Sequence, residues 1–165
     1  MPFVRFPHPA LSRGAVRRPL DAPMQFVAEQ LLLAAQASQA YGLAAAHLGL
    51  VEPVIVVSVA ADPSRRDYQV MFNPRVLDCS QDTESGVEGS VALPGMEVEI
   101  SRPSWVVIDY DDDESVQHSA RYEGFVGRCC LHEIEQMDGV FFLAHLSRLK
   151  REAVLRKFKK GQRSG

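Results

Sequence analysis

The stretch that decides the fold is Leu131-His132-Glu133-Ile134-Glu135-Gln136-Met137-Asp138-Gly139. Positions i and i+4 of an α-helix lie on one face, so His132 and Gln136 are expected to point the same way. In the metallohydrolase pattern H-E-x-x-H, two histidines at this spacing bind a metal ion while the glutamate transfers protons. Here the first histidine and Glu133 are present, and Gln136 replaces the second histidine. The stretch therefore predicts a helix that carries an altered metal site and ends at Gly139.

Strands are expected between this helix and an earlier one. Asp21 is a candidate N-cap, and apolar residues at helical spacing predict a helix over residues 22–40 that stops near Gly42. The second long helix is expected at 125–138. Strands are expected at 53–60, at 68–72 with an extension over 76–79, and at 96–100, 105–110 and 119–123. Residues 4–19 and 81–86 are expected to be an extended lead-in and a polar loop. This order predicts an α+β fold with mainly antiparallel sheets around a central helix.

Composition predicts one domain over residues 1–165. The chain is 46% hydrophobic and 24% charged, which suits one domain with a core. No apolar run approaches the roughly 18 residues of a membrane span, and neither a membrane nor DNA is expected as a partner. Cys129 and Cys130 are adjacent, and three cysteines are an odd number, so a disulfide framework is not expected. A cytoplasmic location follows as the expectation.

The C-terminal part is strongly basic. Eight Lys or Arg residues and the single acid Glu152 follow Ser147, so this tail carries a net charge of +7 and the preceding body −10. A helix is expected over 147–160, capped by Ser147, with an apolar face made of Leu149, Val154, Leu155 and Phe158. Such a tail suits a polyanionic partner, and a solvated helix face is the alternative. By contrast, the four acids at 111–114 lack metal-ligand spacing and indicate a solvated hairpin turn.

Three stretches resemble, in order and spacing, the signature motifs of the peptide deformylase family. They are residues 42–49, 88–94 and 132–136. The segments FPHPAL at 6–11 and HLSRLKR at 145–151 extend the resemblance over about residues 4–160. That family removes the formyl group from the initiator methionine of nascent chains with one divalent metal ion. The resemblance implies this fold, a formyl-methionyl peptide or nascent chain as substrate, and Fe, Zn or Ni as cofactor.

The first motif of the family ordinarily reads G-x-G-L-A-A-x-Q. Residues 42–45 match it, Ala40 replaces the first glycine, and His47 replaces the glutamine. In the family that glutamine donates a hydrogen bond to the formyl oxygen. The resemblance therefore places His47 at a catalytic position, although an imidazole is not expected to reproduce the amide donor.

The second and third motifs ordinarily supply the three metal ligands, in E-G-C-L-S and H-E-x-x-H. Here Ser90 replaces the cysteine, Gln136 replaces the second histidine, and only His132 is kept. Val91 stands where a leucine amide helps to bind the oxyanion, and its backbone N–H survives the change. The resemblance thus implies catalytic positions at Glu133, His47 and Val91, and altered metal-ligand positions at His132, Ser90 and Gln136.

These replacements remove the chemistry that holds the metal. A thiolate brings a charge and a soft donor that an alcohol lacks, and an amide is a poor replacement for imidazole. We therefore expect a divalent metal to be weakly bound or absent, with weak or no deformylase activity. A peptide- or ribosome-binding pseudoenzyme is the resulting hypothesis, with the basic tail on ribosomal RNA. In place of the metal, Ser90, His132, Gln136 and Glu133, with His47, are expected to hydrogen-bond to one another.

Two alternatives keep catalysis. His47, His132 and Glu133 would imitate a two-histidine-one-carboxylate metal set. Ser90 with His47 or His132 as base would make a metal-free hydrolase. Cys129 lies one turn before His132 and is expected to be a core cysteine. Near residue 97 many family members have an arginine or another substrate-contacting residue, and this chain has Glu97 instead. Arg102 is expected to be structural.

Overall fold

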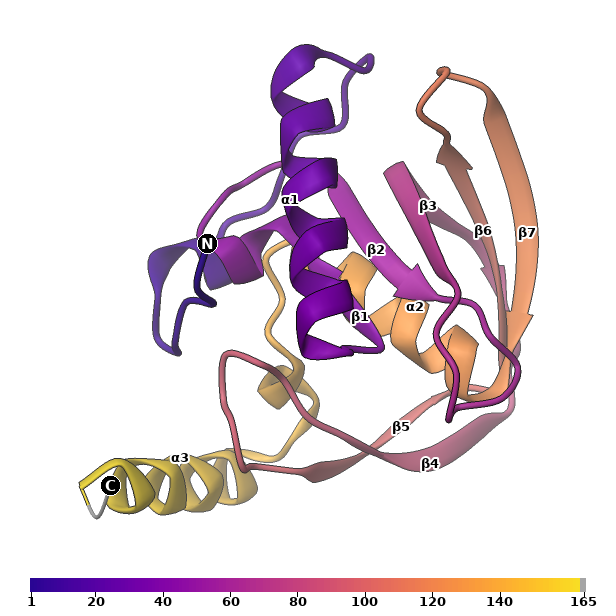
Figure 1. Ribbon diagram of the computed structural model, residues 1–165. Helices are drawn as coiled ribbons and strands as arrows, with labels where there is room; N and C mark the ends of the chain where they lie inside the picture. Colours follow the sequence, from indigo (N-terminus) through magenta and orange to yellow (C-terminus); the bar gives the residue numbers. More distant parts are fainter. Residues whose placement is uncertain (164–165) are drawn as a thin grey trace.

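The computed structural model describes residues 1–163, and Figure 1 shows the arrangement of its elements. Its α-helices are α1 (Ala22–Ser38), α2 (Gly124–Met137) and α3 (Arg148–Arg163). Short 3-10 helices lie at η1 (Pro9–Ser12), η2 (Ala45–Leu48) and η3 (Phe142–His145). The strands are β1 (Gly42–Ala44), β2 (Val54–Ser58), β3 (Tyr68–Cys79), β4 (Thr83–Glu88), β5 (Val98–Pro103), β6 (Trp105–Asp111) and β7 (Gln117–Glu123).

The strands form two antiparallel sheets. One is five-stranded in the order β1-β2-β3-β6-β7, and the other is a two-stranded ribbon of β4 and β5. Every pair in both sheets is antiparallel. The predicted α+β class with mainly antiparallel sheets is therefore confirmed, as is the extension of β3 beyond the Asn73-Pro74 pair.

Helices α1 and α2 cover opposite faces of the five-stranded sheet. Successive side chains of a strand point to opposite faces, so one strand can contribute to both contacts. Strand β2 is buried along its whole length, with Val54 and Val56 packed against α1 and Ile55 and Val57 packed against α2. In Figure 1 the two helices lie on either side of this sheet. The core around this sheet thus has two layers of side chains, one on each face.

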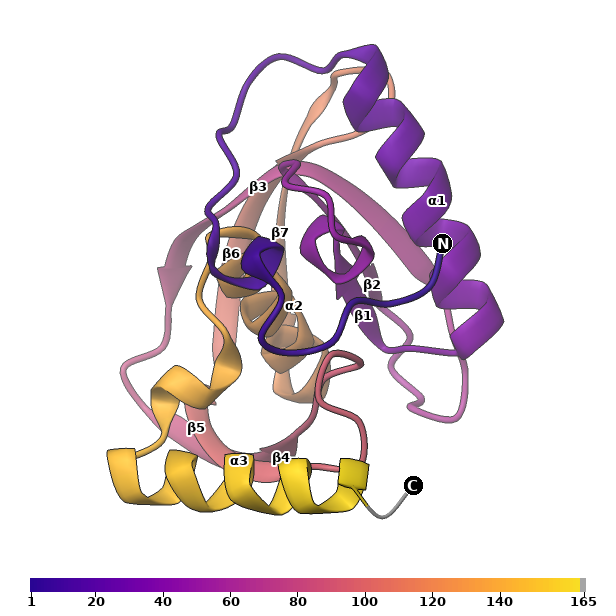
Figure 2. The same ribbon diagram turned by 90° about the vertical axis from the view of Figure 1, so that its left-hand side faces the viewer.

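Helix α2 has the central position that the sequence predicts. Its apolar side packs on the sheet, while Arg128 on another side donates to the backbone oxygens of Glu84 and Ile100 in the β4–β5 ribbon. Helix α3 lies along the same ribbon (Figure 2) and buries Phe158 against Ile100. Helix α2 thus lies between the five-stranded sheet and the ribbon, with Arg128 on the side of the ribbon.

Three local predictions were wrong. Residues 81–86 were expected to be a loop, but β4 pairs with β5 through its backbone and leaves most of its polar side chains in solvent. Helix α1 ends at Ser38 with Gln39 in the left-handed conformation, two residues before the predicted end at residue 40. Leu149 is 78% exposed, and the apolar face of α3 consists of Val154, Leu155 and Phe158.

Several end signals were correct. The side chain of Asp21 accepts a hydrogen bond from the Met24 amide at 3.0 Å, which caps α1. Gly139 has a positive φ of 86°, as expected for the residue after the last turn of α2. The Ser147 hydroxyl accepts from the Lys150 amide at 3.3 Å at the start of α3. Helix α3 runs to Arg163, slightly beyond the predicted residue 160.

Candidate functional site

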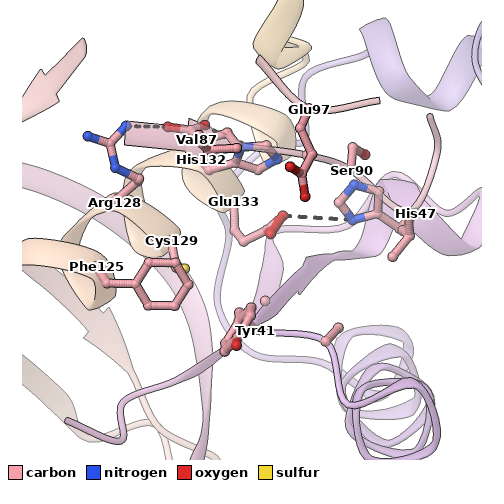
Figure 3. Close-up of a pocket in the computed structure, with 15 residues that line it drawn as sticks. Tyr41, His47, Val87, Ser90, Glu97, Phe125, Arg128, Cys129, His132 and Glu133 are labelled. Carbon is pink, nitrogen blue, oxygen red and sulfur yellow. Dashed lines mark hydrogen bonds and ion pairs between the residues drawn. The ribbon is translucent and has the colours of Figure 1, made fainter. Parts of the chain in front are cut away.

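A cavity of about 380 Å³ lies between α2, the β1–η2 segment and the chain that follows β4 (Figure 3). Its walls combine an apolar part with two histidines and several charged groups. The lining residues are Ala40, Tyr41, Gly42, His47, Val87, Glu88, Gly89, Ser90, Val91, Glu97, Phe125, Arg128, Cys129, His132 and Glu133. Five of the six residues predicted for the site, all except Gln136, are on this wall.

Glu88 is the hub of a buried ion-pair network. One of its oxygens accepts from Arg102 at 2.8 Å and from the Nδ1–H of His132 at 2.7 Å. The other accepts from Arg102 at 2.6 Å and from Arg128 at 2.8 Å. Burial alone would raise the pKa of the Glu88 carboxyl, but the bonds from Arg102 and His132 hold that pKa well below its ordinary value. Glu88 is thus a carboxylate that fixes the ring of His132.

Arg102 is structural, as predicted. It is 2% exposed and also contacts Glu135 at 3.0 Å, whose carboxylate pairs with His145 at 2.8 Å. Burial disfavours a charged His132, but the carboxylates of Glu133 and Glu88 outweigh this effect and raise the pKa of its imidazole. The network therefore compensates the charge of every buried arginine in it.

Arg128 is a second buried cation of this network, and sequence reasoning did not find it. Its guanidinium donates to Glu88, to the Ile100 oxygen at 2.7 Å and to the Glu84 oxygen at 2.7 Å. It occupies the space beside Gly86, where a Cβ would lie only 2.7 Å from the guanidinium carbon. The position of the Arg128 guanidinium thus depends on the absence of a side chain at residue 86.

Glu133 and His47 face each other without a hydrogen bond. The Glu133 carboxylate fits closely over Gly42, whose Cβ would lie 3.0 Å from Oε2. Its Oε1 lies 3.8 Å from His47 Nδ1, which already accepts the Ala44 N–H at 3.0 Å. The ring proton of a neutral His47 therefore resides on Nε2. Within residues 1–163, the buried atoms His47 Nε2 and Glu133 Oε1 have no hydrogen-bond partner.

The protonation of this pair follows from its burial. Burial, with His132 nearby, lowers the pKa of His47 to about 3, so the imidazole is neutral at pH 7. Burial also raises the pKa of Glu133 to about 7, opposed by the positive charge of His132. The cavity thus presents one fixed N–H donor and one carboxyl group that titrates near neutrality.

Gln136 and Ser90 do not form the predicted hydrogen-bonded cluster. The Gln136 amide donates to the Leu11 oxygen of η1 at 2.8 Å, and the Ser90 hydroxyl accepts the Ala92 N–H at 3.1 Å. His132 bonds to Glu88 instead. The prediction was wrong because each polar group finds a nearer partner elsewhere in the fold. In the described part of the chain, Ser90 also has no hydrogen bond to either histidine.

Cys129 lies on the cavity wall and is only partly buried, whereas Cys130 is fully buried in the core of α2. The adjacent side chains therefore do point in different directions, and all three cysteines are free thiols. Burial raises the pKa of Cys129 to about 12, so it is a neutral thiol rather than a thiolate ligand.

The comparisons define the class of this protein. The sequence profile of the polypeptide deformylase family matches residues 1–152. A "peptide deformylase-like" protein of Rhizobium meliloti is 31% identical, with 99% of this chain and 94% of that protein covered. A peptide deformylase of Agrobacterium fabrum is 30% identical, over 99% and 96% of the two chains. This chain belongs to the peptide deformylase family.

The solved structures agree with this assignment. The crystal structure of peptide deformylase from Ehrlichia chaffeensis in complex with actinonin has a TM-score of 0.90 and 27% identity. The alignment covers 99% of this chain and 98% of that one. Within the described residues, no helix is long and apolar enough to cross a membrane.

The family is metal-dependent, but the donor set of this chain does not fit a metal ion. Of the three ligand positions, only His132 offers a strong donor, and Gln136 is bonded to Leu11 outside the cavity. The alternative set of His47, His132 and Glu133 does not gather either: among residues 1–163 no three His, Cys, Asp or Glu side chains could hold a metal ion.

Proposed function

We propose that this chain is a peptide deformylase family member that has little or no metal-dependent deformylase activity and keeps the cavity for a peptide N-terminus. The orientation of Gln136 is the observation that carries the proposal. Its amide is held by the Leu11 oxygen at 2.8 Å, so the third ligand position is directed at the backbone of η1. An active metal site needs three protein ligands and an open position, which this arrangement does not provide.

The remaining site residues then have roles in binding. Glu133, His47 and Val91 keep the catalytic positions, and His132, Ser90 and Gln136 are the altered ligand positions. Without a metal ion to activate a water molecule, Glu133 has no activated nucleophile to deprotonate. The family's ligand, a formyl-methionyl peptide or nascent chain, is therefore bound rather than hydrolysed, and the chain acts as one peptide-binding domain over residues 1–165.

Restoring the ligands tests this proposal. Wild type should show turnover of formyl-Met-Ala-Ser near background, as should Ser90→Cys and Gln136→His alone. The double variant restores the three family ligands and should regain measurable hydrolysis. Adding His47→Gln restores the glutamine that donates to the oxyanion in the family. Loss of such a donor typically costs about 10²–10³ in rate. The triple variant should therefore be the fastest, and wild-type turnover equal to that of the triple variant would contradict the proposal.

The basic helix α3 supports a ribosomal partner. Its apolar face packs on the ribbon, which leaves Arg156, Lys157 and Lys159 exposed. Such a surface suits the phosphates of ribosomal RNA and implies binding that falls steeply with salt. The proposed location is accordingly the cytoplasm, where nascent chains are made.

Co-sedimentation with ribosomes at low and high salt tests this partner. Replacing Lys150, Arg156 and Lys159 with glutamate should abolish association without disturbing the apolar face. Arg65→Glu is the control, because that arginine is also exposed but lies in the β2–β3 connection. Association that survives the triple replacement, or that is unchanged by salt, would contradict a role for α3.

A further inference from the structure

The cavity contains two buried polar atoms that lack a hydrogen-bond partner among the described residues. His47 is 1% exposed and Glu133 5% exposed, and their Nε2 and Oε1 atoms are without partners in the described residues. A buried donor or acceptor without a hydrogen bond costs about 1–3 kcal/mol, and more when it is charged. His47 cannot satisfy Glu133, because its Nδ1 accepts the Ala44 N–H with its single lone pair and has no proton to donate to the carboxylate. Both atoms therefore require a group from outside the chain.

The groups of the cavity that lack hydrogen-bond donors are carboxyl groups. Its cations are already engaged, since Arg128 and His132 both donate to Glu88. Glu97 is exposed at the rim and has no ion pair among residues 1–163, although Lys157 borders the adjoining pocket. Figure 3 shows the side chains of Glu97 and Glu133 directed at the same space beside the His47 ring. The carboxyl groups of Glu97 and Glu133 and the Nε2–H of His47 thus converge on one space, and among residues 1–163 neither carboxyl group accepts a hydrogen bond from a cation.

The chemistry of a matching ligand follows from these groups. It must donate hydrogen bonds to Glu133 and Glu97 and must offer an acceptor to His47 Nε2–H. An α-ammonium group has three N–H donors, and the carbonyl oxygen of the same residue is an acceptor three bonds away. A blocked N-terminus has one N–H and no charge, so it cannot satisfy both carboxylates.

We propose that this cavity binds the free N-terminal amino group of a peptide, with Glu133 and Glu97 as its anionic partners and His47 as the donor to the adjacent carbonyl. The proposal rests on the proposed function and specifies its ligand: the chain selects unformylated N-termini over formylated ones. Hydrogen bonds between ionised groups are roughly twice as strong as those between neutral groups. Charge compensation in the partly desolvated cavity is therefore the source of the selectivity.

The test is calorimetric titration of the whole chain at pH 7 with three peptides: Met-Ala-Ser, formyl-Met-Ala-Ser and acetyl-Met-Ala-Ser. Wild type should bind the free amine at least about tenfold more tightly than either blocked peptide. Glu97→Gln and Glu133→Gln should each remove most of this preference. Glu99→Gln is the matched control, since Glu99 is also an exposed glutamate of the 97–99 segment but does not line the cavity.

The outcomes separate the two proposals. If a blocked peptide binds as tightly as the free amine, the amine assignment is overturned while peptide binding stands. If none of the three peptides binds, both proposals fall. Glu133 is buried, so the fold of Glu133→Gln is checked by its thermal transition. If that variant does not fold, Glu97→Gln at the exposed rim decides the question alone, and an unchanged preference in that variant overturns the proposal.

Discussion

Replacing Gly86 by alanine should destabilise the protein only while Arg128 keeps its long side chain. In the wild-type fold the Arg128 guanidinium occupies the space that a side chain at residue 86 would fill, with its carbon and Nε 2.7 Å from the Cβ position. The backbone of Gly86 does not have a positive φ, so alanine can adopt its conformation. The penalty therefore arises from the collision and not from backbone strain.

The magnitude follows from the contacts of Arg128. Ordinary carbon contacts need about 3.5–4.0 Å, so the guanidinium must move by about 1 Å. Its bonds to Glu88, the Ile100 oxygen and the Glu84 oxygen are 2.7–2.8 Å long and point in different directions, so that shift takes one or two of them beyond hydrogen-bonding distance. A hydrogen bond to a charged group contributes about 1.5–3 kcal/mol. With one or two bonds lost, and about 0.4–1 kcal/mol regained from the unfolded state, Gly86→Ala should cost about 2–4 kcal/mol.

Urea denaturation of a double-mutant cycle checks this reasoning. Arg128→Leu alone should also be destabilising, because it leaves the Ile100 and Glu84 oxygens without their donor. In that background Gly86→Ala should cost little or nothing, which corresponds to a coupling energy of about 2 kcal/mol or more. Gly161→Ala is the control, since no atom lies within 4 Å of its Cβ position. An equal cost of Gly86→Ala in both backgrounds would refute the steric account.

Two further predictions concern the thiols and the first helix. In native protein at pH 8, a thiol reagent should modify the exposed Cys79 quickly but Cys129 and Cys130 only slowly. The reason is that burial raises the pKa of both α2 thiols and keeps them protonated. Rapid modification of two or more thiols per chain would contradict this. Asp21→Ala should lower the free energy of unfolding by about 0.5–2 kcal/mol, because it removes the N-cap of α1; Glu29→Ala on the exposed face of α1 is the control, and equal losses would show that the cap contributes nothing.

Much of the fold was predictable because its signals are local. The N-cap at Asp21, the end of α2 at Gly139 and the apolar run Val54–Val57 of β2 are each encoded in a few adjacent residues. Strand β4 was missed because its polar side chains carry no apolar alternation. It exists through its backbone pairing with β5, and this partner lies beyond the reach of local patterns.

The site was predictable in its membership and not in its contacts. The motif resemblance brought His47, Ser90 and Glu133 to one cavity, as the structure has them. The bond of Gln136 to Leu11 joins residues 125 positions apart, and no spacing rule indicates it. The fit of Arg128 over Gly86 was likewise invisible, because it depends on the strand that was missed. Gly86 in the middle of β4 was the one local signal, because a glycine inside a strand often marks the close approach of another group.

The measurement that tests the central claim most directly is the metal content of the native chain. Protein purified from metal-supplemented medium, and then dialysed anaerobically against Fe²⁺, Zn²⁺ or Ni²⁺, should retain far less than one ion per chain by elemental analysis. The reason is that His132 is the only strong ligand left at the three family positions. The Ser90→Cys/Gln136→His variant, treated identically, should retain metal and so verify the procedure. Retention of about one tightly held ion per chain by the native protein would contradict the account.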